Sequence, residues 1–396
     1  MKHLVNAFFF VLIGSFQAIH PAASSSSFSS SSSIESDLCR KIIGLFHDFG
    51  EKTFIASDSP TVATFFKRFE KVKHFMTDNN AKFDWCRRFN IPMTVRILSE
   101  HAHTSRIDRI VKIDHKSFVT LSLGGEVKVW AGDARVNDWH WVADLADRAY
   151  ICTVAALNSQ TIVTGCHGGY LVLWEQDVAS GVWKKVSQLE GHTHAILGIA
   201  VIDKDTIVTA GSEDTIKIWQ RVLGSQVWQP VDIFSTTNRL ASIAALDKNT
   251  FVTGHKDNGL IRMWSRKNPQ SSWRNSGLMY CGSDCSIERL EKLDDKNFIA
   301  ESYKARFFWT KKSNEREWHL SKMSTKRDTI ISYGGFRNDI CSWIPFDQDT
   351  LIVGYSSGIP RVWKFPSVQE ITLRIVLRDL SEAVMQKIYD ELVDLT

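Results

Sequence analysis

The chain has 396 residues, of which 43% are hydrophobic and 23% are charged. This is an ordinary globular composition, long enough for one large domain and a smaller one, and it argues against a wholly disordered or fibrous chain. The formal net charge is only +4. Because nucleic-acid-binding proteins usually concentrate lysine and arginine on one face, so small an excess gives no support for that class, and we expect no nucleic-acid partner.

Residues 1–23 have the layout of a secretory signal peptide. Lys2 precedes an apolar run from Leu4 to Phe16, and small residues follow at Ala22 and Ala23. The run is too short to span a bilayer comfortably. We therefore expect an exported protein, secreted or extracytoplasmic, with no stable membrane anchor after cleavage. A cytoplasmic protein with an uncleaved hydrophobic N-terminus is the alternative.

The next two segments differ in composition and in period. Residues 24–35 are nearly all serine, which predicts a flexible linker. Residues 36–92 then place apolar side chains at helical spacing. A Ser59-Pro60 pair, which is typical of a helix start, precedes Phe65 and Phe69. The sequence predicts a small helical domain over residues 36–92.

Residues 93–367 contain a repeat with a period of about 45 residues. One tryptophan of each repeat stands at intervals of 44, 45, 45, 45 and 54 residues, namely Trp130, Trp174, Trp219, Trp264, Trp309 and Trp363. A second follows nine residues after each of the first five, namely Trp139, Trp183, Trp228, Trp273 and Trp318. A repeat of this length is typical of propeller blades.

Each repeat also reads as short strands separated by polar turns. The second strands align as SFVTL, TIVTG, TIVTA, TFVTG, NFIAE and TLIVG. Four strands in each of six repeats predict a mainly β fold, a six-bladed β-propeller over residues 93–367.

The third repeat resembles the WD40 repeat family. In that family a histidine before the first strand, a serine or threonine in the second, an aspartate in the following turn and the tryptophan of the third form a buried hydrogen-bonded set. The resemblance implies such a set at His192, Thr209, Asp214 and Trp219. The first repeat keeps His103 and Thr120 with Gly125 at the aspartate position, and the Trp-Asp dipeptide is absent from all six.

Two segments compete to close the ring. The sixth repeat lacks a second tryptophan, and a strand at Thr94–Ser99 is available to complete it, which would remove exposed sheet edges. The alternative is Val368–Val376, in which apolar and polar residues also alternate as in a strand. We favour the N-terminal strand. We expect residues 368–396 to form a strand and helix extension whose last part, Ser381–Leu395, is an amphipathic helix. Pro360 predicts a bulge or loose pairing in the third strand of blade six.

Candidate metal and disulfide sites are weak. The pair Cys281 and Cys285 suits a disulfide or half a metal site, but no matching partners follow. His103 and His192 recur at one repeat position, which the family's hydrogen-bonded set explains without a metal. We therefore expect no metal and no cofactor.

No catalytic motif stands out, and we expect no enzyme. A propeller hydrolase is one alternative, because Ser212–Trp219 resembles the Asp-box of sialidases. An F-box-like ubiquitin-ligase substrate adaptor is another, since helices precede the propeller and Asp84–Phe89 faintly resembles that motif. The WD40 resemblance favours a scaffold that binds proteins or peptides.

The resemblance places the binding surface on the loops before the first strand and between the second and third strands. Arginine and tyrosine, which occur in these loops, are residue types that often dominate interfaces. The candidate partner-binding residues are Arg106, Tyr150, His167, Arg239, His255, Lys256, Tyr303 and Tyr355.

Overall fold

The computed structural model describes residues 41–43, 45, 60, 64, 65, 67, 69, 70, 91, 93–135, 137–282, 285–302, 305–311, 318–325, 340–347, 349–378, 380 and 382–393. The chain forms two compact units, one of Met1–Val62 with Leu380–Thr396 and one of Ala63–Asp379. The predicted signal peptide, the serine-rich linker and most of residues 36–92 lie outside the described residues. Among the described helices, none is both long and apolar enough to cross a membrane.

The first unit contains the predicted C-terminal helix, α8 (Glu382–Val393). Ile388 and Leu392 are buried on one side of it, as its apolar spacing predicts, whereas Val384 is 38% exposed. Ile42 is also buried in this unit. The Lys41 ammonium lies 6.0 Å from the centre of the Tyr389 ring, within the range of a cation–π contact.

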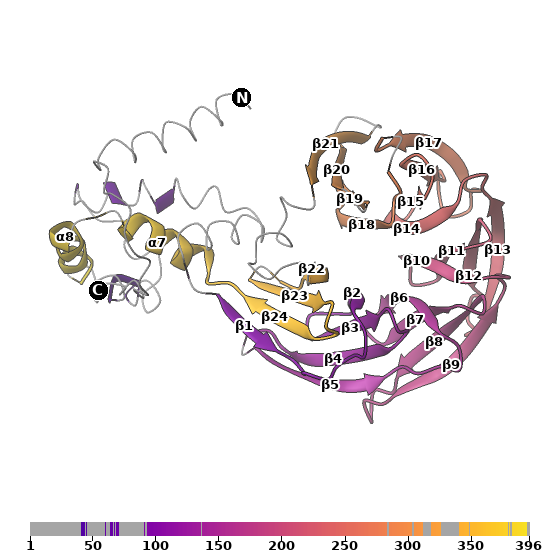
Figure 1. Cartoon of the computed structure of the whole chain (residues 1–396), viewed down its shortest axis with the longest axis horizontal. Helices are drawn as coiled ribbons and strands as arrows, with labels where there is room; N and C mark the ends of the chain where they lie inside the picture. The colour runs from indigo at the N-terminus through magenta and orange to yellow at the C-terminus, as the bar shows by residue number, and fades with distance from the viewer. Residues whose placement is uncertain are drawn as a thin grey trace. The chain divides into compact units, whose positions relative to one another are not determined.

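The second unit contains six four-stranded antiparallel sheets, which we call blades one to six (Figure 1). Blade one is β2 (Ile107–Lys112), β3 (Ser117–Ser122), β4 (Val127–Asp133) and β5 (Asp138–Asp144). Blade two is β6 (Ile151–Asn158), β7 (Thr161–Cys166), β8 (Tyr170–Gln176) and β9 (Trp183–Glu190). Blade three is β10 (Ile196–Asp203), β11 (Thr206–Gly211), β12 (Thr215–Arg221) and β13 (Trp228–Ser235).

The last three blades repeat this order. Blade four is β14 (Leu240–Asp247), β15 (Thr250–His255), β16 (Leu260–Ser265) and β17 (Arg274–Tyr280). Blade five is β18 (Arg289–Asp294), β19 (Asn297–Glu301), β20 (Ala305–Lys311) and β21 (Trp318–Thr325). Blade six is β22 (Ile340–Pro345), β23 (Thr350–Tyr355), β24 (Pro360–Lys364) and β1 (Thr94–Ile97). The predicted mainly β, six-bladed propeller is confirmed.

The ring closes as favoured, through the N-terminal strand. β1 pairs antiparallel with β24, from Thr94 opposite Lys364 to Ile97 opposite Arg361. The competing segment is helical instead, forming α7 (Val368–Arg378), so the strand expected in the C-terminal extension was wrong. Its apolar residues pack on a helix face, with Ile371 and Ile375 in the core of blade six, and this burial outweighs the alternating pattern.

Pro360 causes no bulge in blade six. β23 and β24 pair without a register shift, and Pro360 stands opposite Gly354 as the first residue of its strand. A proline costs least at a strand end, because the N–H that it lacks is then not needed within the ladder. The predicted irregularity was wrong for this reason.

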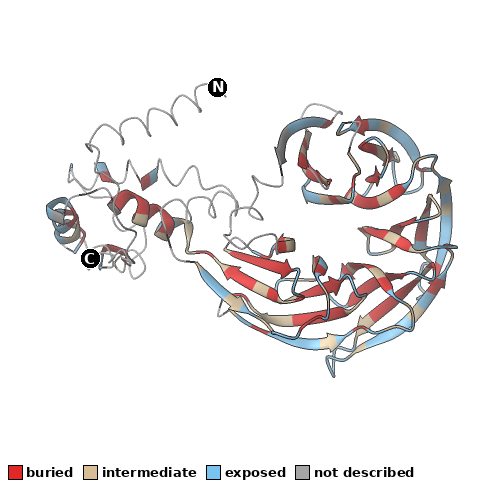
Figure 2. Ribbon diagram, in the orientation of Figure 1, coloured by how far each residue is buried: buried red, intermediate tan, exposed pale blue. Residues whose placement is uncertain are grey.

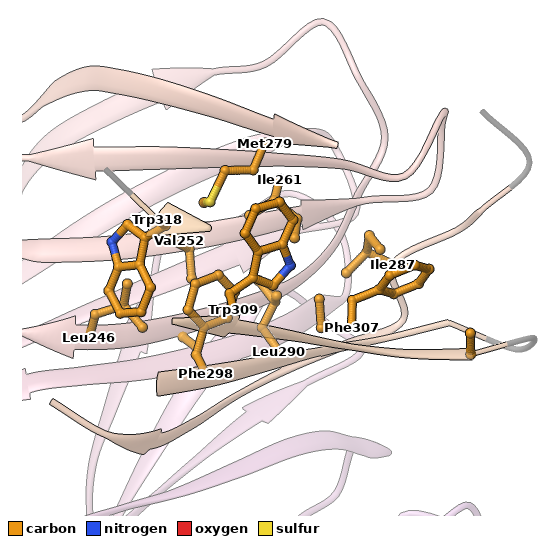
Figure 3. Packing of buried hydrophobic residues seen from close by; sticks show 13 residues of the cluster. Leu246, Val252, Ile261, Met279, Ile287, Leu290, Phe298, Phe307, Trp309 and Trp318 are labelled. Carbon is orange, nitrogen blue, oxygen red and sulfur yellow. The ribbon is translucent and has the colours of Figure 1, made fainter. Parts of the chain in front are cut away.

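Burial decreases from the second strand of a blade to the fourth. β7 and β11 are buried along their whole length, whereas β9 and β13 are largely exposed (Figure 2). The two tryptophans of the repeat lie in this gradient. In blade five, Trp309 and Trp318 both pack on Phe298, with ring centres 6.1 and 4.9 Å away (Figure 3). The tryptophan spacing therefore reports one packing unit in each of the first five blades.

Candidate partner-binding face and the polar network of the blades

A tryptophan–threonine hydrogen bond recurs in the first four blades. The indole Nε1 donates to the threonine hydroxyl of the second strand at 2.9 to 3.1 Å, in the pairs Trp130–Thr120, Trp174–Thr164, Trp219–Thr209 and Trp264–Thr253. All four threonines are fully buried. An unpaired indole N–H would be costly there, so the hydroxyl fixes the register of the third strand against the second.

Blade three extends this bond into the network that its WD40 resemblance implied. His192 Nε2 lies 2.7 Å from Thr209 Oγ1, and His192 Nδ1 lies 2.5 Å from Glu213 Oε1. The bonding pattern assigns the proton to Nδ1, which donates to the carboxylate, while Nε2 accepts from the threonine hydroxyl. The expected hydrogen-bonded set of blade three is therefore present, but Glu213 supplies the carboxylate in place of Asp214.

The carboxylate of the set comes from Glu213, and the implied role of Asp214 was wrong. Asp214 has a φ of 62°, a left-handed conformation that glycines occupy at the same turn position in blades one and two, where Gly125 and Gly169 have φ of 79° and 82°. Its side chain instead accepts the backbone N–H of Leu240, the first strand residue of blade four, at 2.9 Å. Asp214 thus links two blades, and the preceding residue faces the histidine.

Blades one and four build similar networks from other positions. In blade one, His103 Nε2 lies 2.7 Å from Thr120 Oγ1, and its Nδ1 lies 3.4 Å from Glu126. Blade four lacks a histidine before its first strand. There His255, at the end of β15, places Nε2 3.2 Å from Thr253 Oγ1. Blade four therefore also has a hydrogen-bonded chain of imidazole, threonine and tryptophan, although its histidine stands at a different position in the repeat.

Burial sets the protonation of these histidines. Burial lowers the pKa of His103 to about 4, although the nearby Glu126 carboxylate opposes the shift. The pKa values of His192 and His255 are lowered for the same reason. Burial alone would raise the pKa of Glu213, but hydrogen bonds from Thr215 and His192 lower it overall. The network therefore holds neutral imidazoles beside a charged carboxylate.

The loops before the first strands are equivalent in blades one to four. The carbonyls of Arg106, Tyr150, Ala195 and Arg239 each accept a backbone N–H from the residue after the second strand, at 2.8 to 2.9 Å. This shared bond places the two candidate arginines and Tyr150 at the same end of their blades. Both arginine side chains are exposed, and Tyr150 is 45% exposed.

The other candidates divide by burial. His167 and Lys256 are exposed in the turns after β7 and β15. His255 is fully buried in the network above, and Tyr355 is 2% exposed, with the Arg361 guanidinium 4.4 Å from its ring centre. Both are the last residues of second strands and point into the core, so neither side chain is available to a partner. Tyr303 lies outside the described residues.

One side chain of this face, that of Arg106, already pairs with a neighbour. The Arg106 guanidinium lies 3.3 Å from Asp108, and both side chains are about half exposed, so the pair is worth little in water. The pKa of Tyr150 is raised, chiefly by burial of its hydroxyl. The exposed arginines therefore carry their charge into the loop face with only weak internal pairing.

The cysteines and histidines form no metal site in the part of the chain that the structure describes, where no group of three potential ligands comes together. Cys281 and Cys285 are both free thiols. The Cys285 sulfur lies 3.7 Å from the carbonyl of Cys281, and the two side chains pack on the core of blade five. Burial raises the pKa of Cys281 to about 12, which makes it a packing residue at neutral pH.

Sequence reasoning missed Glu126, Glu213 and Asn238. The first two supply the carboxylates of blades one and three, and the backbone carbonyl of Asn238 lies 3.0 Å from His255 Nδ1. Glu126 follows the left-handed Gly125 of its turn, whereas Glu213 precedes the left-handed Asp214, so no single alignment of the turn finds both carboxylates.

No protein-family model matches this sequence, and no curated protein matches it either. The solved structures that it is similar to include the WD40 repeats of RRP9, with 13% identity and a TM-score of 0.47, covering 69% of this chain and 100% of that one. They also include the WD40 β-propeller domain of Doa1, with 14% identity and a TM-score of 0.44, covering 70% of this chain and 98% of that one.

Proposed function

We propose that the protein is a non-enzymatic scaffold that binds other proteins or peptides through the loop face of its propeller. The observation that carries this proposal is the equivalence of Arg106, Tyr150 and Arg239, whose backbones make the same bond in three blades while their side chains stay exposed. Loops held by a rigid scaffold are the usual place for recognition.

The two arginines have no structural task at this position. Ala195 occupies it in blade three with the same backbone bond, so a small side chain suffices for the fold. Arginine and tyrosine are enriched among the residues that dominate interfaces, and arginine suits carboxylates because it can donate two parallel hydrogen bonds. The partner class that fits best is an acidic peptide or a chain with an accessible C-terminal carboxylate.

The test replaces both arginines by alanine and measures binding to an array of acidic peptides and free C-terminal peptides. We expect an unchanged melting temperature and weaker capture, since one charge-assisted contact is worth about 1.5–3 kcal/mol. The charge-matched control is Arg135→Ala with Arg274→Ala, two exposed arginines in other loops and strands. Equal capture by both double variants and by the original chain would move the binding surface elsewhere.

Export remains part of this proposal, on the layout of residues 1–23. Intact-mass measurement on native material decides it, and a mature chain that still begins at Met1 would contradict it. The residues that resemble an F-box motif, Asp84–Phe89, lie outside the described residues.

A further inference from the structure

The turn between the second and third strands has the same geometry in blades one, two, three and six. In each of them the backbone N–H of the left-handed residue donates to the carbonyl of the last residue of the second strand, at 3.0 to 3.1 Å. The residue that opens the turn is exposed in all four blades, as Leu123, His167, Ser212 and Ser356. Three of these residues are polar, so Leu123 is an apolar exception on the loop face.

Leu123 contributes nothing to the turn that a serine would not. Its backbone N–H donates to the carbonyl of Arg106 at 2.8 Å, and Ser212 makes the equivalent bond to Ala195 in blade three at 2.9 Å. The Leu123 side chain is 48% exposed. A single exposed leucine is ordinary, whereas exposed apolar groups that lie together with polar groups around them mark an interaction surface.

The ring of Tyr150, which precedes the first strand of blade two, lies against the same turn. A Cβ added to Gly125 would lie 3.1 and 3.2 Å from Cδ2 and Cγ of Tyr150, so the ring covers this glycine. The other side of the ring is open, because Tyr150 is still 45% exposed. Leu123 and Tyr150, which we call the apolar pair, therefore border one turn at the seam between blades one and two.

Two exposed arginines border the apolar pair. Arg106 is bonded through its backbone to Leu123, and Arg148 stands two residues before Tyr150. The Arg106 guanidinium pairs with Asp108 at 3.3 Å, but both side chains are about half exposed, so water and a partner compete easily for this arginine.

The other carboxylates beside the turn are already engaged. The Asp147 side chain is only 6% exposed and lies 3.3 Å from the Lys185 ammonium. Glu126, which follows the turn, accepts the backbone N–H and the hydroxyl of Thr104, each at 2.9 Å. An approaching chain therefore meets apolar surface and guanidinium groups here, which is complementary to an acidic segment with an apolar side chain.

We propose that the apolar pair holds one bulky apolar side chain of a peptide whose neighbouring residues are acidic, with their carboxylates on Arg106 and Arg148. The inference rests on the loop-face function proposed above and names the partner chemistry of that face. Contact with Leu123 and Tyr150 removes apolar surface from water, which favours binding, and the guanidinium groups orient the acidic residues. A peptide with acidic residues alone would leave the apolar pair in water.

The test titrates the full chain with labelled peptides, capped at both ends, that carry two glutamates on each side of one variable residue. Fluorescence anisotropy reports binding. We expect leucine or phenylalanine at the variable position to bind about tenfold more tightly than serine, as burial of one large apolar side chain implies. Equal affinity for the three peptides would overturn this inference and leave the loop-face proposal standing. Binding of none of them would also overturn it, and the array of acidic and C-terminal peptides then decides the loop-face proposal separately.

Three variants locate the contact. Leu123→Ser introduces the residue that blades three and six hold at this position, and it should remove the preference for the apolar peptides without changing the melting temperature. Tyr150→Ala, with the residue of blade three, should do the same; if it lowers the melting temperature, Leu123→Ser decides alone. The control is Leu223→Ser, because Leu223 is 99% exposed in the turn between β12 and β13, and it should keep the preference. A preference that survives in folded Leu123→Ser would overturn the proposal.

Discussion

Blades one to four and blades five and six reach the same architecture with different chemistry. The first four anchor the repeat tryptophan on a buried threonine, and three of them add an imidazole. In blade five Ala300 replaces the threonine, and the Trp309 indole donates to no oxygen among the described residues. In blade six Val353 takes that place.

The apolar part of the repeat is what all six blades share. Phe298 packs between two tryptophans in blade five much as Phe118 does in blade one and Phe251 in blade four. Blades two, three and six place a fully buried aliphatic residue opposite the tryptophan instead, namely Ile162, Ile207 and Leu351. Every blade therefore has a buried apolar partner for its tryptophan, whereas blades five and six form without the threonine of the polar network. The comparison indicates that packing supplies most of the stability and that the hydrogen bonds fix register.

The largest expected effect comes from removing the tryptophan of the best-formed network. Trp219 is 1% exposed and makes both the packing and the hydrogen bond of blade three. Trp219→Ala should lower the free energy of unfolding by about 3–5 kcal/mol, the usual cost of truncating a buried aromatic. Denaturant unfolding measures it. The control is Trp141→Ala, a tryptophan that is 46% exposed, and equal losses in both variants would contradict a central role for Trp219.

The second prediction isolates the hydroxyl that joins two partners. Thr209→Val keeps the shape of the side chain but leaves Trp219 Nε1 and His192 Nε2 unpaired in the core. We expect a loss of about 1–3 kcal/mol. Thr153→Val is the matched control, because Thr153 is equally buried and its hydroxyl has no hydrogen-bond partner among the residues that the structure describes. It should be neutral or slightly stabilising, and the same loss in both variants would mean that the network contributes nothing.

Much of the difference between the blades could be predicted from the sequence, because it depends on the repeat length and on which residue types the second strands contain. The tryptophan interval predicted six blades, and SFVTL against NFIAE already distinguished threonine-containing blades from blade five. Closure by β1 followed from the missing second tryptophan.

The roles of several other residues could not be predicted, because they depend on three-dimensional contacts that aligning the repeats residue by residue does not show. Glu213 replaces Asp214 because the turn needs a left-handed residue, and His255 enters the network from a strand end. The sequence of α7 alternates apolar and polar residues as a strand does, and only its packing on blade six shows that it is a helix.

The third prediction concerns pH and the network of blade one. The folded pKa of His103 is about 4, below its unfolded value near 6.5. The unfolded chain therefore binds the proton first, so stability is fully present above pH 6.5 and falls as the pH drops toward 4, by at most about 1.4 kcal/mol for each pH unit from this group. The lowered pKa of Glu126 adds a further loss below its unfolded value.

Melting temperatures between pH 7 and pH 4.5 test this. His103→Gln removes the titrating group and keeps an amide that can reach Thr120, so its profile should be flatter than that of the original chain. A profile as steep as the original would assign the acid sensitivity to other groups.

The smallest expected effect comes from giving blade five the threonine of its neighbours. Ala300 is fully buried and stands at the register position of Thr253, one strand away from the tryptophan whose indole lacks an oxygen partner. Ala300→Thr should let Trp309 Nε1 donate to the new hydroxyl and raise the free energy of unfolding by about 0.5–1.5 kcal/mol, the usual net worth of one hydrogen bond. Ala300→Val separates the bond from the added bulk, because it fills the same space without a hydroxyl. If the threonine and valine variants unfold at the same denaturant concentration, blade five has no use for the bond, and the polar network of blades one to four is a device for their register alone.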